Sequence, residues 1–241
     1  MRVMISGGAA IDPAILQFFN DLGFIAVQGY GLTECAPMAA LNPDTHKTMR
    51  NASVGHIFPE TEVRIDRPDA DGIGEICIKG DNVMLGYYNM PEQTADVIRD
   101  GWFYTGDLGY VDKDGFIYIT GRSKNVIITA NGKNVFPEEL EYHLGKIPYV
   151  SESMVWAGSD EAGQDTVIVA SIYPDASALE EKLGAGYTPE AVEALLRGEV
   201  DKLNDTLPLF KQIRRIVVRE EEFEKTTGKK IKRFVEANRK A

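Results

Sequence analysis

The chain has 241 residues, of which 44% are hydrophobic and 26% are charged, as is ordinary for a folded globular protein of one or two domains. No apolar run reaches the roughly 18 residues of a transmembrane helix, and the N-terminal residues lack the apolar stretch of a signal peptide. A net charge of −11 disfavours a general nucleic-acid binder, which needs a broad basic face. Two distant cysteines, Cys35 and Cys77, predict neither a disulfide framework nor a zinc site and favour the reducing cytoplasm.

The first 50 residues show strand and helix signals in alternation. The segment 2–8 (RVMISGG) reads as a strand, and Asp12 and Pro13 are typical of a helix start. The helix continues to Gly23 with an apolar face, and 25–31 (IAVQGYG) reads as a buried strand. We therefore expect an α/β remnant over residues 1–50, whose first strand requires neighbours that this chain does not supply.

The signals change over residues 51–122. Strand-like segments at 61–66, 74–80 and 116–120 are separated by Gly, Pro and Asp clusters, with a short helix at 90–100. This pattern predicts a small antiparallel β subdomain.

Within this subdomain, residues 101–122 (GWFYTGDLGYVDKDGFIYITGR) predict a hairpin around Asp114-Gly115. If those two residues form the loop, Asp107 lies opposite Arg122, while a type I turn with a bulge at Gly115 shifts the pairing by one or two residues. Either geometry places a carboxylate and a guanidinium at one end of the hairpin. A surface ion pair of little energetic value would explain this pair equally well.

Residues 123–241 predict a separate compact α+β domain. A hairpin is expected on Asn131-Gly132, helices at 137–147 and 188–207, and strands at 150–158, 165–174 and 214–220. The last segment, 225–241 (KTTGKKIKRFVEANRKA), has seven Lys or Arg residues and one Glu. This basic end of an acidic protein indicates a discrete anionic ligand, and a solvated C-terminal helix is the alternative.

Two short segments carry further chemistry. In 6–12 (SGGAAID), Gly7 and Gly8 follow a strand and precede a helix, without the spacing of a dinucleotide fingerprint or a P-loop. In 28–37 (QGYGLTECAP), Tyr30 between glycines is able to expose a ring face, Thr33 offers a hydroxyl and Glu34 a carboxylate. Such groups suit an aromatic base, a phosphate oxygen and a hard cation such as Mg²⁺, although a loop with a capping Thr-Glu accounts for them too.

Five motifs in order give the chain a resemblance to the adenylate-forming acyl-CoA synthetase superfamily. They are YGLTE, GWFYTGDLG, GR followed two residues later by Lys, NGKNVFPEELE and KTTGKKIKR. Residues 121–141 look most like bacterial long-chain fatty-acyl-CoA ligases. The resemblance implies a two-step reaction, in which a carboxylate and ATP give an acyl-adenylate and pyrophosphate, and CoA then displaces AMP.

The resemblance also implies roles for individual residues. Asp107 would accept hydrogen bonds from both ribose hydroxyls and Arg122 would donate to the same sugar, since a carboxylate has two acceptor oxygens and a guanidinium is a rigid donor fork. Lys124 would be the hinge about which the C-terminal domain rotates, and Gly132 would leave room for the pantetheine of CoA. In the ATP or AMP site the implied groups are the backbone of Gly8 and Ala9 lining adenine, the Tyr30 ring stacked on adenine with Gly31 next to it, Thr33 on the α-phosphate and Glu34 on Mg²⁺.

The terminal motif departs from the family form Lys-Thr-x-Ser/Thr-Gly-Lys-Ile-x-Arg. Without a gap, Lys230 becomes the catalytic lysine, Gly228 takes the Ser/Thr position and Lys229 takes the Gly position. Matching Gly-Lys literally selects Lys229 but requires an insertion, so Lys230 is preferred. Its ammonium would offset charge that develops on the carboxylate and α-phosphate oxygens.

The family's phosphate-binding loop, a Ser/Thr/Gly-rich run followed by Pro-Lys-Gly, does not occur in the chain. We therefore expect the C-terminal portion of a longer acyl-CoA ligase, with residues 1–122 from the large AMP-binding domain and 123–241 as the mobile domain, and without activity by itself. An enzyme that loads an amino or aryl acid onto a carrier protein, and a non-catalytic nucleotide- or partner-binding module, remain alternatives. Acyl chain length and oligomeric state are not predicted, and membrane association through an acyl substrate stays open.

Overall fold

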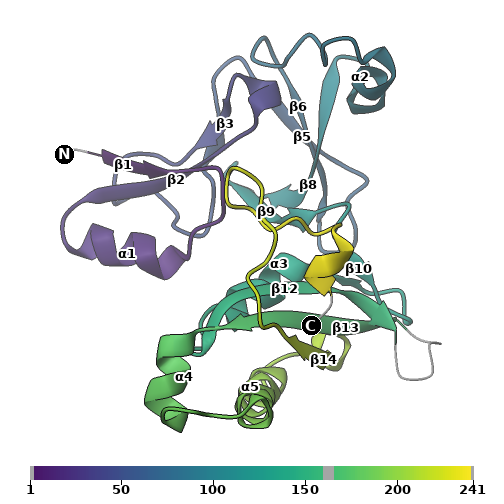
Figure 1. Cartoon of the computed structure of the whole chain (residues 1–241). Helices are drawn as coiled ribbons and strands as arrows, with labels where there is room; N and C mark the ends of the chain where they lie inside the picture. Colours follow the sequence, from purple (N-terminus) through teal and green to yellow (C-terminus); the bar gives the residue numbers. More distant parts are fainter. Residues whose placement is uncertain (1–2, 160–165, 240–241) are drawn as a thin grey trace. The chain divides into compact units, whose positions relative to one another are not determined.

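The computed structural model describes residues 3–159 and 166–239. The chain divides into two compact units, residues 1–124 and 125–241, and the boundary expected after residue 122 lies two residues before this division. Figure 1 shows the elements of each unit, coloured along the sequence.

Unit 1 begins with the expected β-α-β arrangement. Strand β1 (Val3–Ser6) pairs in parallel with β2 (Ile25–Gly31), and α1 (Pro13–Asp21) connects them. Asp12 caps α1 by accepting a hydrogen bond from the Ala14 N–H at 2.8 Å, and Gly23 follows the helix with φ +87°. The sheet continues antiparallel through β3 (Met38–Leu41) and β4 (His56–Ile57), two strands that the sequence pattern did not predict.

Most of the apolar face expected on α1 is exposed in this chain. Leu16 is buried, whereas the side chains around it are exposed by a third to more than a half. These exposed residues are Ile15, Phe18, Phe19 and Leu22. The predicted helix is therefore confirmed, while most of its apolar face lies outside the core of unit 1.

The predicted antiparallel subdomain is confirmed as a five-stranded sheet. Its strand order is β5 (Glu62–Asp66), β6 (Gly74–Lys79), β8 (Trp102–Val111) and β7 (Ile98–Arg99), with β9 (Ile117–Arg122) also paired to β8. The short helix α2 (Pro91–Val97) precedes β7. The buried side chains of β6, β8 and β9 form one core with those of β2 and β3, so both sheets of unit 1 share a hydrophobic cluster.

Unit 2 is the expected α+β domain. Strands β12 (Val150–Ser159) and β13 (Thr166–Pro174) are antiparallel, and β13 is parallel to β14 (Ile213–Val218). Residue 165, which the sequence assigned to the second of these strands, lies outside the described residues. A small hairpin of β10 (Ile127–Ile128) and β11 (Asn134–Val135) precedes the sheet.

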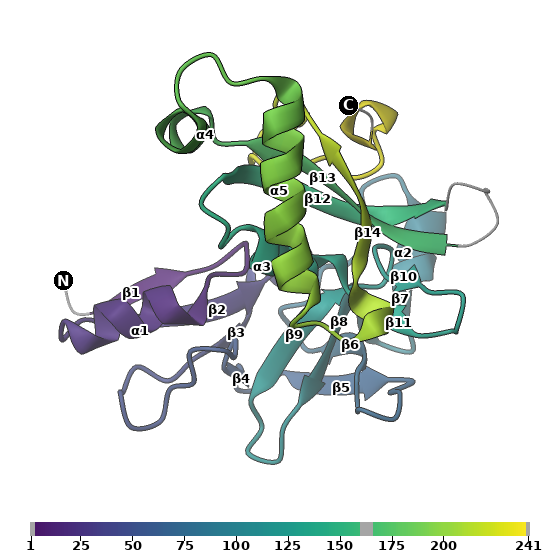
Figure 2. The same cartoon turned by 90° about the horizontal axis from the view of Figure 1, so that it is seen from below.

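Three helices contribute to the core of unit 2. Helices α3 (Pro137–Leu144) and α5 (Pro189–Asn204) were expected, whereas α4 (Ala176–Leu183) was not. Buried residues of all three pack with apolar side chains of the sheet, and Figure 2 shows α5 lying across that sheet. No helix of the described residues is long and apolar enough to span a membrane.

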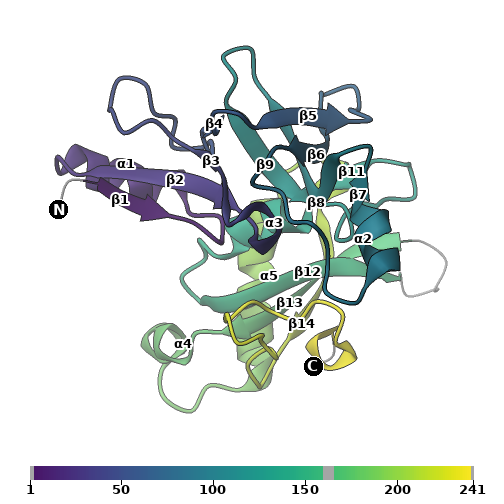
Figure 3. The ribbon, with the colours of Figure 1, turned by 90° about the horizontal axis from the view of Figure 1, so that it is seen from above.

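The basic C-terminal segment, which begins at residue 225, does not form the solvated helix that was the alternative interpretation of its charge pattern. Beyond β14 it contains an isolated β-bridge and one 3₁₀ turn, η3 (Glu236–Arg239), within the described residues. Figures 2 and 3, seen from opposite sides, place this segment on the sheet face opposite α5. Buried Arg219 holds it there by donating to the carbonyl oxygen of Ala237 at 2.8 Å, a tertiary contact that a charge pattern cannot reveal.

Candidate functional site

The β8–β9 hairpin confirms that Asp107 lies opposite Arg122. Of the two turns that the sequence left open, the structure has the type I turn with a bulge at Gly115, because Asp112 N–H donates to Phe116 O and Gly115 has φ +83°. That bulge shifts the pairing by one residue. A second irregularity between Leu108 and Gly109 shifts it back, so the acid and the base meet despite the different turn.

Asp107 is a buried carboxylate with two strong partners. Its side chain is on β8, where Oδ1 lies 2.7 Å from the Nε of Arg122 on β9. The hydroxyl of Tyr30 on β2 donates to Oδ2 at 2.5 Å. A buried charge is tolerated when it is paired and hydrogen-bonded, and these two contacts meet that condition.

The expectation that Tyr30 exposes a ring face is wrong. Only 8% of Tyr30 is exposed, and its ring belongs to the hydrophobic core that joins the two sheets of unit 1. Burial and the neighbouring Asp107 raise the pKa of the phenol far above its usual value, so the hydroxyl remains a donor. Its position between two glycines suggested exposure, but those glycines serve the strand pairing.

Gly31 and Gly8 are required for different reasons. A Cβ on Gly31 would lie 2.1 Å from the carbonyl oxygen of Pro37. Only glycine therefore permits β2 to approach the residue before β3 so closely. Gly8 has φ +81°, with open space where a Cβ would be. Gly8 and Ala9 are both exposed, in the loop between β1 and α1.

Thr33 and Glu34 lie on the 3₁₀ turn η1 (Thr33–Cys35), which follows β2. Thr33 is exposed and Glu34 is half-buried. The backbone carbonyl of Glu34 accepts from Met84 N–H at 2.8 Å, and its carboxylate Oε1 accepts from the Tyr87 hydroxyl at 2.9 Å. Sequence reasoning missed Tyr87, because it lies 53 positions away and no periodicity links the two residues.

The site fits Mg²⁺ only in the manner typical of nucleotide enzymes. Within residues 3–159 and 166–239 no group of three metal-ligating side chains is found, so a cage made entirely of protein ligands is not formed. Mg²⁺ in such enzymes is usually held by one or two carboxylates together with substrate phosphates. Glu34, at the exposed edge of unit 1, is a carboxylate suited to that role.

In unit 2, Gly132 occupies the expected hairpin turn. The Gly132 N–H donates to Thr129 O and its φ is +70°, so this loop has the same bulged geometry as that of β8–β9. A Cβ at Gly132 would meet nothing within 4 Å, so conformation is what requires the glycine. Lys124 is the last residue of unit 1, and the division between the units follows it directly.

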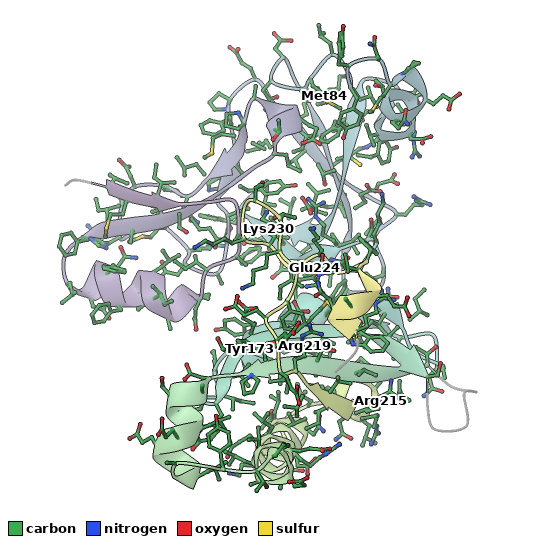
Figure 4. The ribbon with its side chains drawn as sticks, in the orientation of Figure 1. Met84, Tyr173, Arg215, Arg219, Glu224 and Lys230 are labelled. Carbon is green, nitrogen blue, oxygen red and sulfur yellow. The ribbon has the colours of Figure 1, made fainter. Side chains whose placement is uncertain are left out.

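The structure bears on the choice between Lys229 and Lys230. An isolated bridge joins Lys225 to Ile231 and closes a loop in which Lys229 has φ +59°. That left-handed conformation favours glycine, which is the residue that the gap-free alignment places at position 229 in the family form. The gap-free alignment therefore agrees with the backbone, and Figure 4 labels Lys230 on this loop.

Two hollows on unit 1 lie away from these residues. One is lined by Met38, Phe58–Thr61 and Asp81–Asn82, the other by side chains of α1 and of residues 46–51. Neither is lined by Tyr30, Asp107 or Arg122. The structure thus joins these three through direct contacts.

Similarity to known proteins agrees with these features. Residues 1–88 match the AMP-binding enzyme family. A long-chain-fatty-acid–CoA ligase of Yersinia pestis is 35% identical over 228 residues, which are 89% of this chain and 40% of that protein. A feruloyl-CoA synthase of an Amycolatopsis species is 36% identical over 179 residues, 70% of this chain and 36% of that protein.

Solved structures show the same relationship. The o-succinylbenzoate CoA synthetase of Bacillus subtilis, in complex with its acyl-adenylate intermediate, has a TM-score of 0.79 and 27% identity, covering 97% of this chain and 45% of that one. The chain spans less than half the length of these relatives. It therefore has the sequence motifs and the fold of the C-terminal portion of an adenylate-forming acyl-CoA synthetase, which confirms the resemblance and the fold class expected from the motifs.

Proposed function

We propose that this chain provides the ribose-binding and lysine-bearing parts of an ATP-dependent, AMP-forming acyl-CoA ligase. The observation that carries the proposal is the buried Asp107 carboxylate, held by Tyr30 and Arg122 at the end of a hairpin. Motif similarity alone would not require these three side chains to meet. Their contact provides the rigid acceptor that a nucleoside diol needs.

In the proposed first step, a carboxylate oxygen of the acid attacks the α-phosphorus of ATP. The new C–O–P linkage forms the acyl-adenylate and the bond to pyrophosphate breaks. Asp107 accepts from the ribose hydroxyls, Arg122 donates to the sugar, and Thr33 donates to an α-phosphate oxygen. Mg²⁺, which Glu34 would hold, neutralises phosphate charge when bound; Gly8 and Ala9 line the adenine.

In the proposed second step, the sulfur of CoA attacks the acyl carbon, the bond between that carbon and the phosphate oxygen breaks, AMP leaves with this oxygen, and the thiol proton passes to solvent. Unit 2 would turn about Lys124 between the steps. Lys230 serves the first step by placing its ammonium beside the developing charge, and Gly132 lies beside pantetheine in the second. In this proposal the hydroxyl of Tyr30 holds Asp107. Because the ring is buried, no more than its edge is able to contact the adenine base.

Long-chain fatty acids are the proposed substrates, supported by the long-chain ligases among the relatives. An aryl acid is the second candidate, because the similar proteins include a feruloyl-CoA synthase and an anthranilate CoA ligase. A cytoplasmic location is part of the proposal and is supported by the two free cysteines, Cys35 and Cys77.

The ribose contact is testable in this chain by ligand-observed NMR with AMP and 2′,3′-dideoxy-AMP. We expect weak binding of AMP and at least about tenfold weaker binding of the dideoxy analogue, since two charge-assisted hydrogen bonds are lost. Asp107→Asn should remove the preference. Asp96→Asn, on the exposed surface of α2, is the control and should keep it.

Equal binding of the two nucleotides by the unaltered chain would refute the ribose assignment. Failure to bind AMP at all would favour a partner-binding module. Pyrophosphate release from ATP with fatty acid and CoA should stay at background, and turnover by the 241 residues would contradict the expected inactivity of this chain by itself.

A further inference from the structure

The loop that carries Lys230 is a small hairpin, residues 225–231, here called the Lys230 hairpin. Thr226 holds it from within, because its N–H donates to Lys230 O at 2.8 Å and its Oγ1 accepts from Lys230 N–H at 3.2 Å. Lys229 N–H also donates to Thr226 O at 2.9 Å. Both backbone groups of Lys230 are therefore fixed to one residue.

Internal bonds are insufficient to hold this hairpin on unit 2. The residues at its tip, from Thr226 to Lys230, are all exposed, so no apolar burial opposes its detachment. A short two-stranded hairpin is at best marginally stable in water. The position of Lys230 must therefore depend on anchors at the two ends of the hairpin.

The anchor at the C-terminal end is partly buried and bidentate. Arg233 Nη1 donates to Glu141 Oε1 at 2.8 Å, and Nη2 donates to Glu141 Oε2. Val155 N–H donates to the same Oε1 at 2.7 Å, and Arg233 Nη1 reaches Val155 O at 3.4 Å. The pair thus connects the end of the hairpin to α3 and to the middle of β12 at once.

The anchor at the N-terminal end is weaker. Lys225 Nζ contacts Glu152 on β12 and lies 2.9 Å from Glu222. Glu222 is 65% exposed, so its ion pair contributes little, while the Lys225 and Glu152 side chains are 22% and 24% exposed. Lys225 makes this contact as a point charge, without the bidentate geometry of a guanidinium. The side chains of Arg233 and Glu141 are 22% and 17% exposed, and Glu138 lies 3.8 Å from Arg233 Nη2. Removal of Arg233 would therefore leave the partly buried Glu141 carboxylate without its cation.

We propose that Glu141 and Arg233 are positioning residues, which fix the Lys230 hairpin to α3 and β12 so that the ammonium of Lys230 has a defined place in unit 2. The catalytic meaning of this anchor rests on the proposed function, which assigns Lys230 to the adenylation step. The existence of the anchor does not depend on the proposed function, since the contacts that form it all lie within unit 2. The anchor assigns a role to two motif residues that take no part in the proposed reaction: Glu141, the last Glu of FPEELE, and Arg233, the last Arg of KTTGKKIKR.

Limited trypsin proteolysis of the whole chain tests the anchor, because Lys229 and Lys230 are themselves cleavage sites. Arg233→Gln removes the guanidinium, and Lys232→Gln is the matched control, since it also deletes one trypsin site but breaks only an exposed ion pair with Glu224 at 3.6 Å. Cleavage within α5, after Arg197 and Lys202, reports on unit 2 as a whole.

We expect Arg233→Gln and Glu141→Gln to increase cleavage after Lys229 and Lys230 at least about tenfold, with cleavage in α5 unchanged, because local opening follows the loss of local contacts. Lys232→Gln should leave all rates unchanged. If Arg233→Gln fails to fold, Arg233→Lys, which keeps the charge and loses the bidentate geometry, and Glu141→Gln decide the matter.

Two results would overturn the proposal. One is a folded variant whose hairpin is cleaved at the rate of the unaltered chain. The other is an equal increase at the α5 sites, because the pair would then stabilise unit 2 generally and not the hairpin. Neither result depends on nucleotide binding, so failure of the anchor and failure of the proposed ligase function are distinguishable.

Discussion

Replacement of Tyr30 by Phe tests whether the hydroxyl bound to Asp107 stabilises unit 1. The change removes one oxygen and keeps the ring in the core. The lost hydrogen bond spans 2.5 Å between two residues that are 8% and 5% exposed, so water has little access to replace it. Hydrogen bonds to charged groups contribute about 1.5–3 kcal/mol, and we expect the free energy of unfolding of unit 1 to fall by about 2 kcal/mol.

The assay takes advantage of the positions of the two tryptophans. Trp102 lies in unit 1 and Trp156 in unit 2, so a Trp156→Phe background makes fluorescence report on unit 1 alone. With a urea m-value of about 2 kcal/mol per M, the loss corresponds to a decrease of about 1 M in the midpoint. Tyr88→Phe is the control, because Tyr88 is 90% exposed, and it should change stability by less than about 0.5 kcal/mol.

A Tyr30→Phe midpoint that matches the Tyr88→Phe midpoint would refute the reasoning. It would mean that the carboxylate gains equal stabilisation from Arg122 or solvent. The phenol would then have no role in holding Asp107, and the ribose acceptor would depend on the hairpin alone.

Three further changes test separate parts of the structure. Gly31→Ala should lower the stability of unit 1 by about 2 kcal/mol or more by the same fluorescence assay, since its Cβ would lie 2.1 Å from a backbone oxygen; no loss would show that β2 and its neighbour separate easily. Lys229→Gly should slow trypsin cleavage after Lys230, because glycine adopts the left-handed backbone at this position without the cost of about 1 kcal/mol that lysine incurs. Gly228→Ala should not slow cleavage, because the φ of Gly228 lies outside the left-handed region. Equal effects of the two changes would contradict the assignment of Lys229 to the glycine position of the motif. Burial raises the pKa values of Cys35 and Cys77 to about 11, so their contribution to stability is complete below pH 9 and is lost as pH rises toward 11. Urea midpoints across that range should fall less steeply in a Cys35→Ala, Cys77→Ala chain, and identical slopes would show that the thiols do not titrate differently on folding.

The sequence by itself determined the elements whose signals are local. Asp12-Pro13 before an apolar repeat is sufficient for α1, and Thr188-Pro189 similarly begins α5, because a cap satisfies backbone groups within one turn. Glycine after Asp or Asn marked both hairpins, since only a left-handed residue closes these loops without strain. Ordered motifs supplied the family resemblance, and the fold agrees with it.

Tertiary structure decided what depends on distant segments. Tyr30 was expected to expose a ring face, yet β2 is an inner strand of a sheet that shares its core with the five-stranded sheet, so the ring is buried and its hydroxyl reaches Asp107. A helix was the alternative for the basic C-terminal segment, but Arg219 binds to Ala237 of this segment, and Arg233 within it binds to α3 and β12 of unit 2. Glu141 and Arg233 are 92 positions apart, and no periodicity links residues at that separation. Packing of the whole unit is what removes water from such a pair, and that is why the anchor of the Lys230 hairpin became visible only in three dimensions.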